Sequence, residues 1–241
     1  MKKPKIIFLR ADDICRPDLK FKKVFDFLAE NEIPANYAAI PGKTTSALSD
    51  FVRKRSAPAK LVNFIQHGWK HVNHCAEPGG ARYEFGPARV KKQQKHDISR
   101  GFDRMRAIFR ELFAPAFAPP FHAYDETTVL LCAEMKFGVF AAGKKLFPLP
   151  DSKMIYLPFT VALSEYGSDL RPRPLPLERM IAATELRLRE SSVAGVRFHH
   201  DAFFGSHLDD FMRYCRFMKK LETAGIVKFA LISDVIARNS Y

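Results

Sequence analysis

The chain has 241 residues, of which 47% are hydrophobic, so it can bury a core as one large domain or two small ones. No apolar run approaches the roughly 20 residues of a membrane-spanning helix, which argues against a transmembrane segment. The net charge of +13 is best interpreted as a general solubility charge, and attraction to an anionic substrate or peripheral contact with an anionic surface is the second interpretation. The sequence contains no arginine-rich arm, zinc-finger spacing or aromatic RNA-binding motif, so we expect no nucleic-acid partner.

The N-terminal sequence predicts a cytoplasmic protein. Met1–Lys5 is basic, but the apolar run Ile6–Leu9 ends at Arg10 and is shorter than the roughly 7–15 apolar residues of a signal peptide. The four cysteines include no CxxC pair and are expected to be reduced, packed thiols.

Apolar runs and amphipathic stretches alternate along the chain. In chain order, the apolar runs predict strands over Ile6–Leu9, Asn36–Ile40, Val62–Ile65, Gly138–Ala141, Met154–Phe159, Ala194–His199 and Val227–Ile232. The amphipathic stretches predict helices over Lys20–Asn31, Ser46–Arg55, Ile98–Phe113, Asp125–Met135, Leu177–Ser191 and Ser206–Ala224. Prolines make Ala114–Phe121 extended, and Asn73–Lys95 is a long polar insertion.

Repeated strand–helix units predict a mostly parallel sheet. With this many strands, and no glycine-rich phosphate loop after the first, a closed or distorted barrel is favoured over an open doubly wound sheet. We therefore expect one α/β domain over residues 1–241 with a loop insertion at about 73–95. Functional groups of such barrels lie at the carboxyl ends of the strands. Four short segments, which we call the strand tips, fall at these ends: Asp12-Asp13, His67, Pro120-Phe121 and His199-His200.

Two of these tips carry residues that can bind a metal. His67 and His71 are spaced i, i+4, which suits two zinc ligands on one helical turn, although that spacing alone is a weak signal. Asp12 and Asp13 can supply a third ligand and a general base. Three protein ligands leave one position for water, as a catalytic metal requires. Each pair also has an ordinary interpretation, as helix caps or as hydrogen-bonded loop residues, but their combination favours a hydrolase site.

A histidine at the end of a late strand can protonate a leaving group. Because side chains alternate along a strand, only one of His199 and His200 should face the site. We favour His200. An ordinary hydrogen-bonded histidine is the alternative.

These tips, in this order, resemble the polysaccharide deacetylases, the NodB-homology or carbohydrate esterase family 4 group. The resemblance spans Ile6 to Val235. It implies that Asp12 is the general base and His200 the general acid. It also implies that Asp13, His67 and His71 bind the metal.

The chain departs from the family pattern at several positions. Gly68 stands where the second motif has Ser or Thr, and Ala118 stands where the third motif has Arg. The fourth motif, an Asp and Trp segment that orients the catalytic histidine, has no counterpart. Either another cation replaces the missing Arg or the activity is altered. The insertion Asn73–Lys95 is either a source of substitutes or a plain loop.

The resemblance implies a distorted (β/α)7 barrel that binds one divalent ion, zinc or else Co²⁺, Ni²⁺, Fe²⁺ or Mn²⁺. The implied reaction is hydrolysis of a linear amide C–N bond, which removes an N-acetyl or related N-acyl group from an amino sugar of a polysaccharide or glycoconjugate. Substrate contacts are expected from Trp69, Pro120, Phe121 and His199, with ordinary packing as the alternative. A non-catalytic glycan-binding or partner-binding protein on the same barrel is the alternative function.

Overall fold

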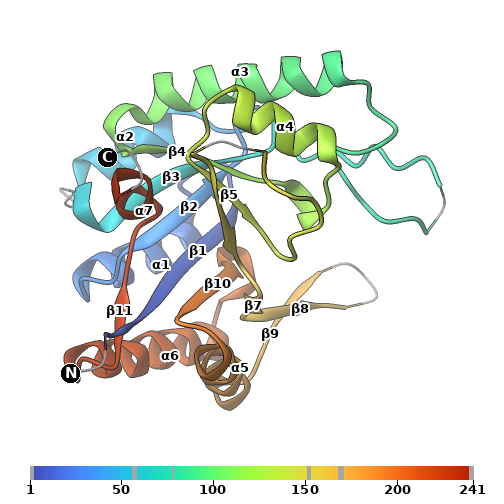
Figure 1. Ribbon diagram of the computed structural model, residues 1–241. Coiled ribbons are helices and arrows are strands. Elements are labelled where there is room, and N and C mark those ends of the chain that lie inside the picture. Colours follow the sequence, from blue (N-terminus) through green and yellow to red (C-terminus); the bar gives the residue numbers. More distant parts are fainter. Residues whose placement is uncertain (1–2, 56–58, 78, 151–152, 168–170, 239–241) are drawn as a thin grey trace.

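The computed structural model describes residues 3–55, 59–77, 79–150, 153–167 and 171–238. Within these residues, nine strands form one sheet in which all paired strands run parallel. Their order is β6-β5-β4-β3-β2-β1-β10-β7, with β11 beside the start of β1. The sheet curls, and helices cover its outside, as Figure 1 shows. The prediction of a distorted (β/α)7 barrel in a single domain is confirmed.

The strands of the sheet are β1 (Lys5–Ile14), β2 (Ala35–Ala39), β3 (Val62–His67), β4 (Phe113–Ala118), β5 (Val139–Ala142), β6 (Ile155–Pro158), β7 (Val161–Ala162), β10 (Val193–His199) and β11 (Val227–Phe229). A separate antiparallel pair is formed by β8 (Ser164–Tyr166) and β9 (Pro172–Pro174). The helices are α1 (Leu19–Glu30), α2 (Ser46–Lys54), α3 (Lys91–Phe109), α4 (Glu126–Glu134), α5 (Leu177–Glu190), α6 (Ser206–Thr223) and α7 (Ile232–Arg238). Short 3-10 turns are η1 (Ala59–Leu61), η2 (Arg110–Leu112), η3 (Pro120–His122) and η4 (His200–Ala202).

The two faces of β1 show how the sequence builds the barrel. Ile7, Leu9 and Ala11 face outward and pack with apolar side chains of the surrounding helices. Phe8 faces inward, where it meets small and branched side chains of the neighbouring strands. Because side chains alternate, Arg10 and Asp12 continue the inward face. The carboxyl ends of the strands thus carry polar groups, and we call this end of the barrel the barrel mouth.

The barrel closes between β6 and β10 without a hydrogen-bonded ladder between these two strands. At this seam the backbones come very close, because a Cβ on Gly195 of β10 would lie 2.0 Å from the carbonyl oxygen of Pro158 in β6. Only glycine allows this approach. The missing ladder is what makes the barrel distorted.

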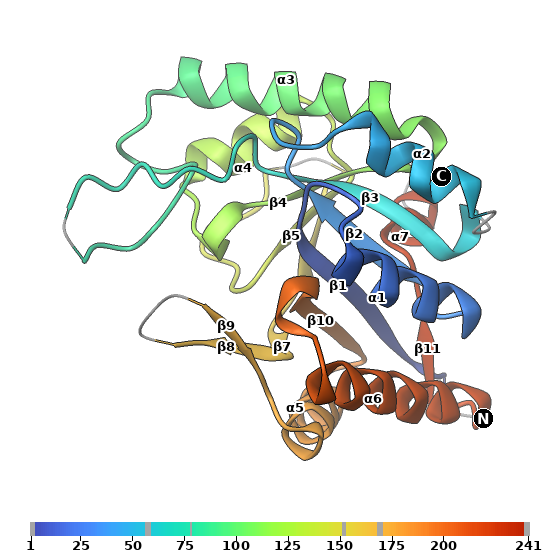
Figure 2. The same cartoon turned by 180° about the vertical axis from the view of Figure 1, so that it is seen from behind.

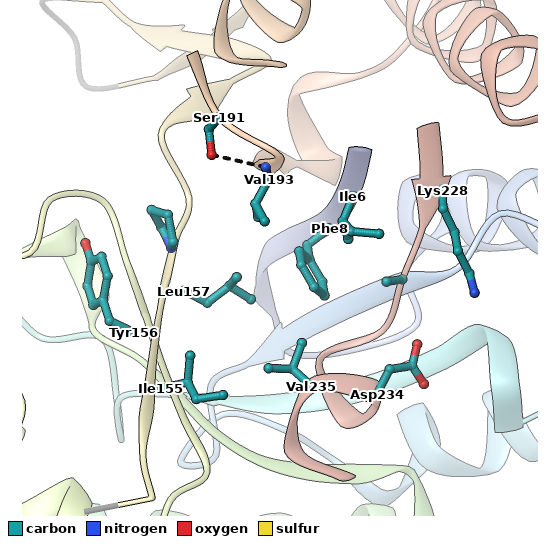
Figure 3. Close-up of a pocket in the computed structure, with 12 residues that line it drawn as sticks. Ile6, Phe8, Ile155, Tyr156, Leu157, Ser191, Val193, Lys228, Asp234 and Val235 are labelled. Carbon is teal, nitrogen blue, oxygen red and sulfur yellow. Dashed lines mark hydrogen bonds between the residues drawn. The ribbon is translucent and has the colours of Figure 1, made fainter. Parts of the chain in front are cut away.

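A pocket of about 460 Å³ lies at the amino-terminal end of the barrel. Figure 3 shows Ile6, Phe8, Leu157 and Val235 around it, with Lys228 and Asp234 to one side. Its lining includes residues near the starts of β1 and β10, the length of β6 and residues of α7, so it lies away from the carboxyl end of β1 that carries Asp12.

Three segments differ from the sequence expectations. The helix expected from Ile98 begins at Lys91, inside the segment expected to be a loop. Its first turn lacks an apolar stripe and is held instead by Gln94, whose amide group bonds Asp125 and Thr128 of the neighbouring α4 region. The strand expected over Val227–Ile232 ends at Phe229, and α7 follows. The pair β8–β9 was not expected.

The described chain ends lie on one side of the molecule, and the β8–β9 pair and the insertion lie on the other (Figures 1 and 2). No helix among the described residues is long and apolar enough to cross a bilayer.

Candidate metal centre and active site

Asp12 ends the inward face of β1 and is 2% exposed. Arg10, two positions earlier on this face, donates from Nε and Nη2 to the two carboxylate oxygens of Asp12 at 2.6 and 2.8 Å. Its Nη1 donates to the carbonyl of Ala141 at 2.9 Å. Burial alone would raise the pKa of Asp12, but the Arg10 guanidinium, with a contribution from His67, holds it well below its ordinary value. Asp12 is therefore an ionised carboxylate in a fixed orientation.

Asp13 reaches the same mouth because β1 is irregular at this point. Adjacent side chains of a regular strand point to opposite faces. Here the register with β2 shifts between Ala11 and Ile14, and Asp13 has a φ of 63°. Such irregularities re-aim a side chain next to a site, and the left-handed backbone costs about 1–3 kcal/mol at a residue other than glycine. The strained residue brings two adjacent carboxylates to one opening.

Asp13, His67 and His71 converge on one point. Oδ1 of Asp13 lies 3.2 Å from Nε2 of each histidine, and the potential ligand atoms all lie within 4.8 Å of one another. This oxygen is buried and accepts no hydrogen bond from the described residues. A carboxylate oxygen facing two imidazole nitrogens, with no donor of its own, is an environment that a divalent cation completes. The three side chains therefore fit a divalent ion.

The protonation of the two histidines agrees with this arrangement. Nδ1 of His67 lies 3.0 Å from the carbonyl oxygen of Ala118, so in the neutral ring Nδ1 carries the proton and Nε2 keeps its lone pair towards Asp13. Burial opposes a charge on His67, but the carboxylates of Asp13 and Asp12 raise its pKa in the metal-free protein. Burial, together with His67, lowers the pKa of His71 to about 4, which leaves it neutral.

The loop that carries His71 is held by the insertion. Glu84 accepts the backbone N–H groups of Trp69, Lys70 and His71 at 3.0, 2.6 and 2.9 Å. Gly68 has a φ of 60°, and a Cβ there would lie 2.0 Å from Oε2 of Glu84. The carboxylate thus occupies the space that a Ser or Thr side chain would need. Burial raises the pKa of Glu84, and the three N–H groups oppose that rise.

The structure brings His199 to the mouth. His199 is the neighbour of Asp12 in the parallel register of β10 with β1, so both side chains share the inward face. Its Nε2 lies 3.7 Å from Oδ2 of Asp13 and 2.8 Å from the hydroxyl of Tyr166 on β8. Its Nδ1 is buried and has no hydrogen-bond partner among the described residues.

His200, expected from the resemblance to be the general acid, lies elsewhere. It opens η4, and its Nε2 lies 3.5 Å from a carboxylate oxygen of Asp18, the N-cap of α1. Its ring packs edge-on against Phe21. The alternation argument correctly required one inward histidine, but the structure turns His199 inward and points His200 towards α1.

Of the other residues expected to contact the substrate, the structure places one at the mouth and two in the interior. Phe121 lies at the mouth with a φ of 59°, and its ring centroid is 4.3 Å from that of His71. Pro120 is buried beneath Gly68. Trp69 is 7% exposed and packs in an apolar cluster with Phe85 and Phe117, so its ring offers no open face to a sugar.

The structure adds groups to the site that the motifs did not indicate. Arg10 could have been found from strand alternation, because it precedes Asp12 by two positions. His122 follows Phe121 in η3, and Nε2 of its half-buried ring lies 3.9 Å from Oδ2 of Asp12. Tyr166 comes from a strand pair too short to leave a periodic signal.

Comparison of the sequence finds no matching family model and no similar curated protein. Comparison of the fold finds a protein from Mycobacterium smegmatis described as a polysaccharide deacetylase, with a TM-score of 0.72 at 13% identity over 99% of this chain and 91% of that one. The chain has the polysaccharide deacetylase fold.

Further proteins share the deacetylase fold. A family 4 acetyl xylan esterase from Clostridium thermocellum, solved with a cobalt ion, has a TM-score of 0.62 at 12% identity over 97% of this chain and 91% of that one. A family 4 pseudoenzyme from Bacillus anthracis has a TM-score of 0.53 at 12% identity over 97% and 66%. Because the deacetylase fold includes a pseudoenzyme, the argument for an activity rests on the site.

Proposed function

We propose that the chain is a metal-dependent carbohydrate deacetylase. It hydrolyses the linear amide C–N bond of an N-acetyl or related N-acyl group on an amino sugar of a polysaccharide or glycoconjugate. The observation that carries the proposal is the convergence of Asp13, His67 and His71 beside a second, ionised carboxylate. Two imidazoles and a carboxylate suit zinc, and Co²⁺, Ni²⁺, Fe²⁺ and Mn²⁺ accept the same donors.

The residues divide the proton transfers between them. When bound, the ion would polarise the acyl carbonyl and acidify the attacking water. Asp12 accepts a proton from that water; its low pKa makes it a weak base, so it requires an acidified water. Arg10 keeps its carboxylate ionised and aimed. His199, in place of His200, donates a proton to the departing amine as the C–N bond breaks, which leaves a carboxylic acid and a free amine. The Tyr166 hydroxyl must release Nε2 of His199 for this step.

A non-catalytic glycan-binding protein is the second candidate. It is favoured by the absence of the fourth motif, since no described residue orients His199 through Nδ1. The Ala at position 118 no longer favours it, because Arg10 supplies the cation that position 118 lacks.

The test is metal content per chain for the wild type, Asp13→Ala and His67→Ala, with His96→Ala on the exposed face of α3 as the matched control. We expect about one divalent ion in the wild type and the control and little in the two site variants. Loaded protein is then assayed for acetate release from N-acetylated and O-acetylated sugars, which separates amide from ester hydrolysis. No metal after reloading, or bound metal without acyl release from either class, would favour the non-catalytic protein.

The cytoplasmic location stays a prediction, which cell fractionation tests. Such a location would favour a biosynthetic intermediate over a finished cell-wall polymer as the substrate.

A further inference from the structure

Arg197 places a second guanidinium inside the barrel. In β10, Ala194, Val196 and Phe198 pack outward with the helices, so the alternate residues, including Arg197 and His199, face inward. In the register with β1, Arg197 neighbours Arg10, and His199 neighbours Asp12. Arg197 therefore lies on the same inward face of β10 as His199, two residues nearer the amino-terminal end of the strand.

The two guanidiniums differ in their partners. Arg10 is fully buried, and each of its three nitrogens donates to Asp12 or to the carbonyl of Ala141. Arg197 is half-buried, and in the part of the chain that the structure describes no acceptor hydrogen-bonds its side chain and no carboxylate pairs with it. Asp12 is hydrogen-bonded to Arg10 and makes no ion pair with Arg197 among the described residues. No nitrogen of Arg197 is a fully buried atom without a partner, so its N–H donors remain accessible to a ligand.

The charge of Arg197 acts on titratable side chains at the mouth. Burial lowers the pKa of His122 and of His199, and the charge of Arg197 adds to this lowering, together with that of Arg10 at His122. Burial also lowers the pKa of Arg197, and Asp12 opposes that effect. With Arg10 balanced by Asp12, a divalent ion on Asp13 would leave one positive charge, and Arg197 adds another.

Cations also flank the rim of the mouth. The guanidinium carbon of Arg82, from the insertion, lies 4.3 Å from the ring centroid of Phe121. Lys43 contributes to lowering the pKa of His71. The potential at the mouth therefore favours an anionic ligand over a neutral one.

We propose that Arg197 binds an oxyanion, a carboxylate or phosphate group that the substrate carries close to the acylated nitrogen. A guanidinium presents a planar fork of donors that matches such groups in a bidentate way. The inference rests on the proposed function and narrows it: the substrate class becomes acidic N-acyl amino sugars. A bound neutral sugar that displaces water from the guanidinium would leave it unpaired.

The test compares three probes with the metal-loaded protein: N-acetylglucosamine, N-acetylmuramic acid and N-acetylglucosamine 1-phosphate. The two acidic sugars distinguish a carboxylate from a phosphate. Binding is measured by calorimetry and hydrolysis by acetate release, for the wild type, Arg197→Gln, Arg197→Lys and the exposed control Arg189→Gln on α5. We expect the wild type to prefer one acidic sugar over the neutral sugar by roughly tenfold or more, as a charge-assisted pair provides.

Arg197→Gln should abolish this preference, Arg197→Lys should retain part of it, and Arg189→Gln should leave it unchanged. Equal binding of neutral and acidic sugars by the wild type would overturn the proposal. An equal loss for all sugars in Arg197→Gln would also overturn it, because Arg197 would then position Asp12 or His199. Preferential binding of an acidic sugar without acetate release would refute the proposed activity and leave the oxyanion site standing.

Discussion

The guanidinium that holds Asp12 comes from β1, two residues away in sequence. The resemblance to family 4 enzymes places that cation on a different strand, at position 118, where this chain has alanine. An arginine at either position could bond the carboxylate of Asp12. Arg10 can do so because alternate residues of a strand share one face. The guanidinium beside Asp12 therefore belongs to a residue outside the motifs.

Replacing Arg10 should destabilise the protein strongly. Arg10→Met leaves Asp12 as a buried carboxylate without a partner, and breaking a buried pair costs about 3–5 kcal/mol of unfolding free energy. Denaturant unfolding of the metal-free protein measures this loss. The matched control is Arg55→Met, which breaks an exposed pair with Asp26 that should contribute at most about 1 kcal/mol.

A companion variant isolates the cause. Asp12→Asn in the Arg10→Met background removes the unpaired charge and should recover part of the stability. If the double variant is as unstable as Arg10→Met, the loss comes from packing around the guanidinium and the ion pair is not its source.

Glu84 holds the loop that carries His71 and fills the space beside Gly68, so a substitution of either residue should weaken metal binding. Glu84→Ala removes the acceptor of three N–H groups in the loop that carries His71. Loss of a group that orients a ligand typically lowers metal affinity about 10–100-fold. Metal titration measures the change, with Glu77→Ala, an exposed acid of the same insertion, as the control.

Gly68→Ser tests the same pair from the other side. It restores the hydroxyl residue of the family pattern but meets Glu84 and Pro120 and requires a left-handed backbone. We expect it to lower metal affinity further than Glu77→Ala does. Tighter metal binding by Gly68→Ser would show that Glu84 does not occupy the space of the hydroxyl.

At the scale of elements, sequence patterns identified those parts of the barrel that bury an apolar face. Strands such as β3 and helices such as α6 have such a face, and their positions were predicted within a few residues. β1 continues to Ile14, beyond the end predicted at Leu9. The first turn of α3 was missed because Gln94 holds it through polar contacts with α4, which produce no periodicity. His199 shares a face of β10 with Arg197, opposite Val196 and Phe198, so the alternation of that strand could have indicated its direction.

The seam between β6 and β10 gives a prediction at this scale. Gly195→Ala adds a Cβ that would lie 2.0 Å from a backbone oxygen, which cannot move like a side chain. We expect a loss of about 1–3 kcal/mol or more in unfolding free energy. In Gly143→Ala the nearest atom to the new Cβ is 3.6 Å away, so that variant is the control. Equal stability of the two variants would mean that the backbones of β6 and β10 move apart without a loss of unfolding free energy.

At the scale of the whole molecule, the site joins residues that are far apart in the sequence, from Asp12 to His199. Their order along the chain suggested which strands carry them, since parallel strands bring their carboxyl ends together. The bulge at Asp13 and the contribution of the insertion could not be predicted, because both depend on contacts between distant segments.

Metal binding should therefore stabilise the entire barrel, because the ligands come from β1 and from the end of β3. A ligand present at 100 times its dissociation constant adds about 2.7 kcal/mol to the unfolding free energy. Thermal unfolding with and without added zinc measures this, and Asp13→Ala should lose the effect. An equal response of Asp13→Ala would mean that zinc binds outside the proposed centre.

The position of the chain ends has a practical consequence. Both lie on the side away from the β8–β9 pair and the insertion (Figures 1 and 2). A tether at either end can fix the protein to a solid support with the mouth facing the solution. Immobilised in this way, one sample can be stripped with a chelator, recharged with each divalent ion in turn and exposed to polymers too large to diffuse into a gel.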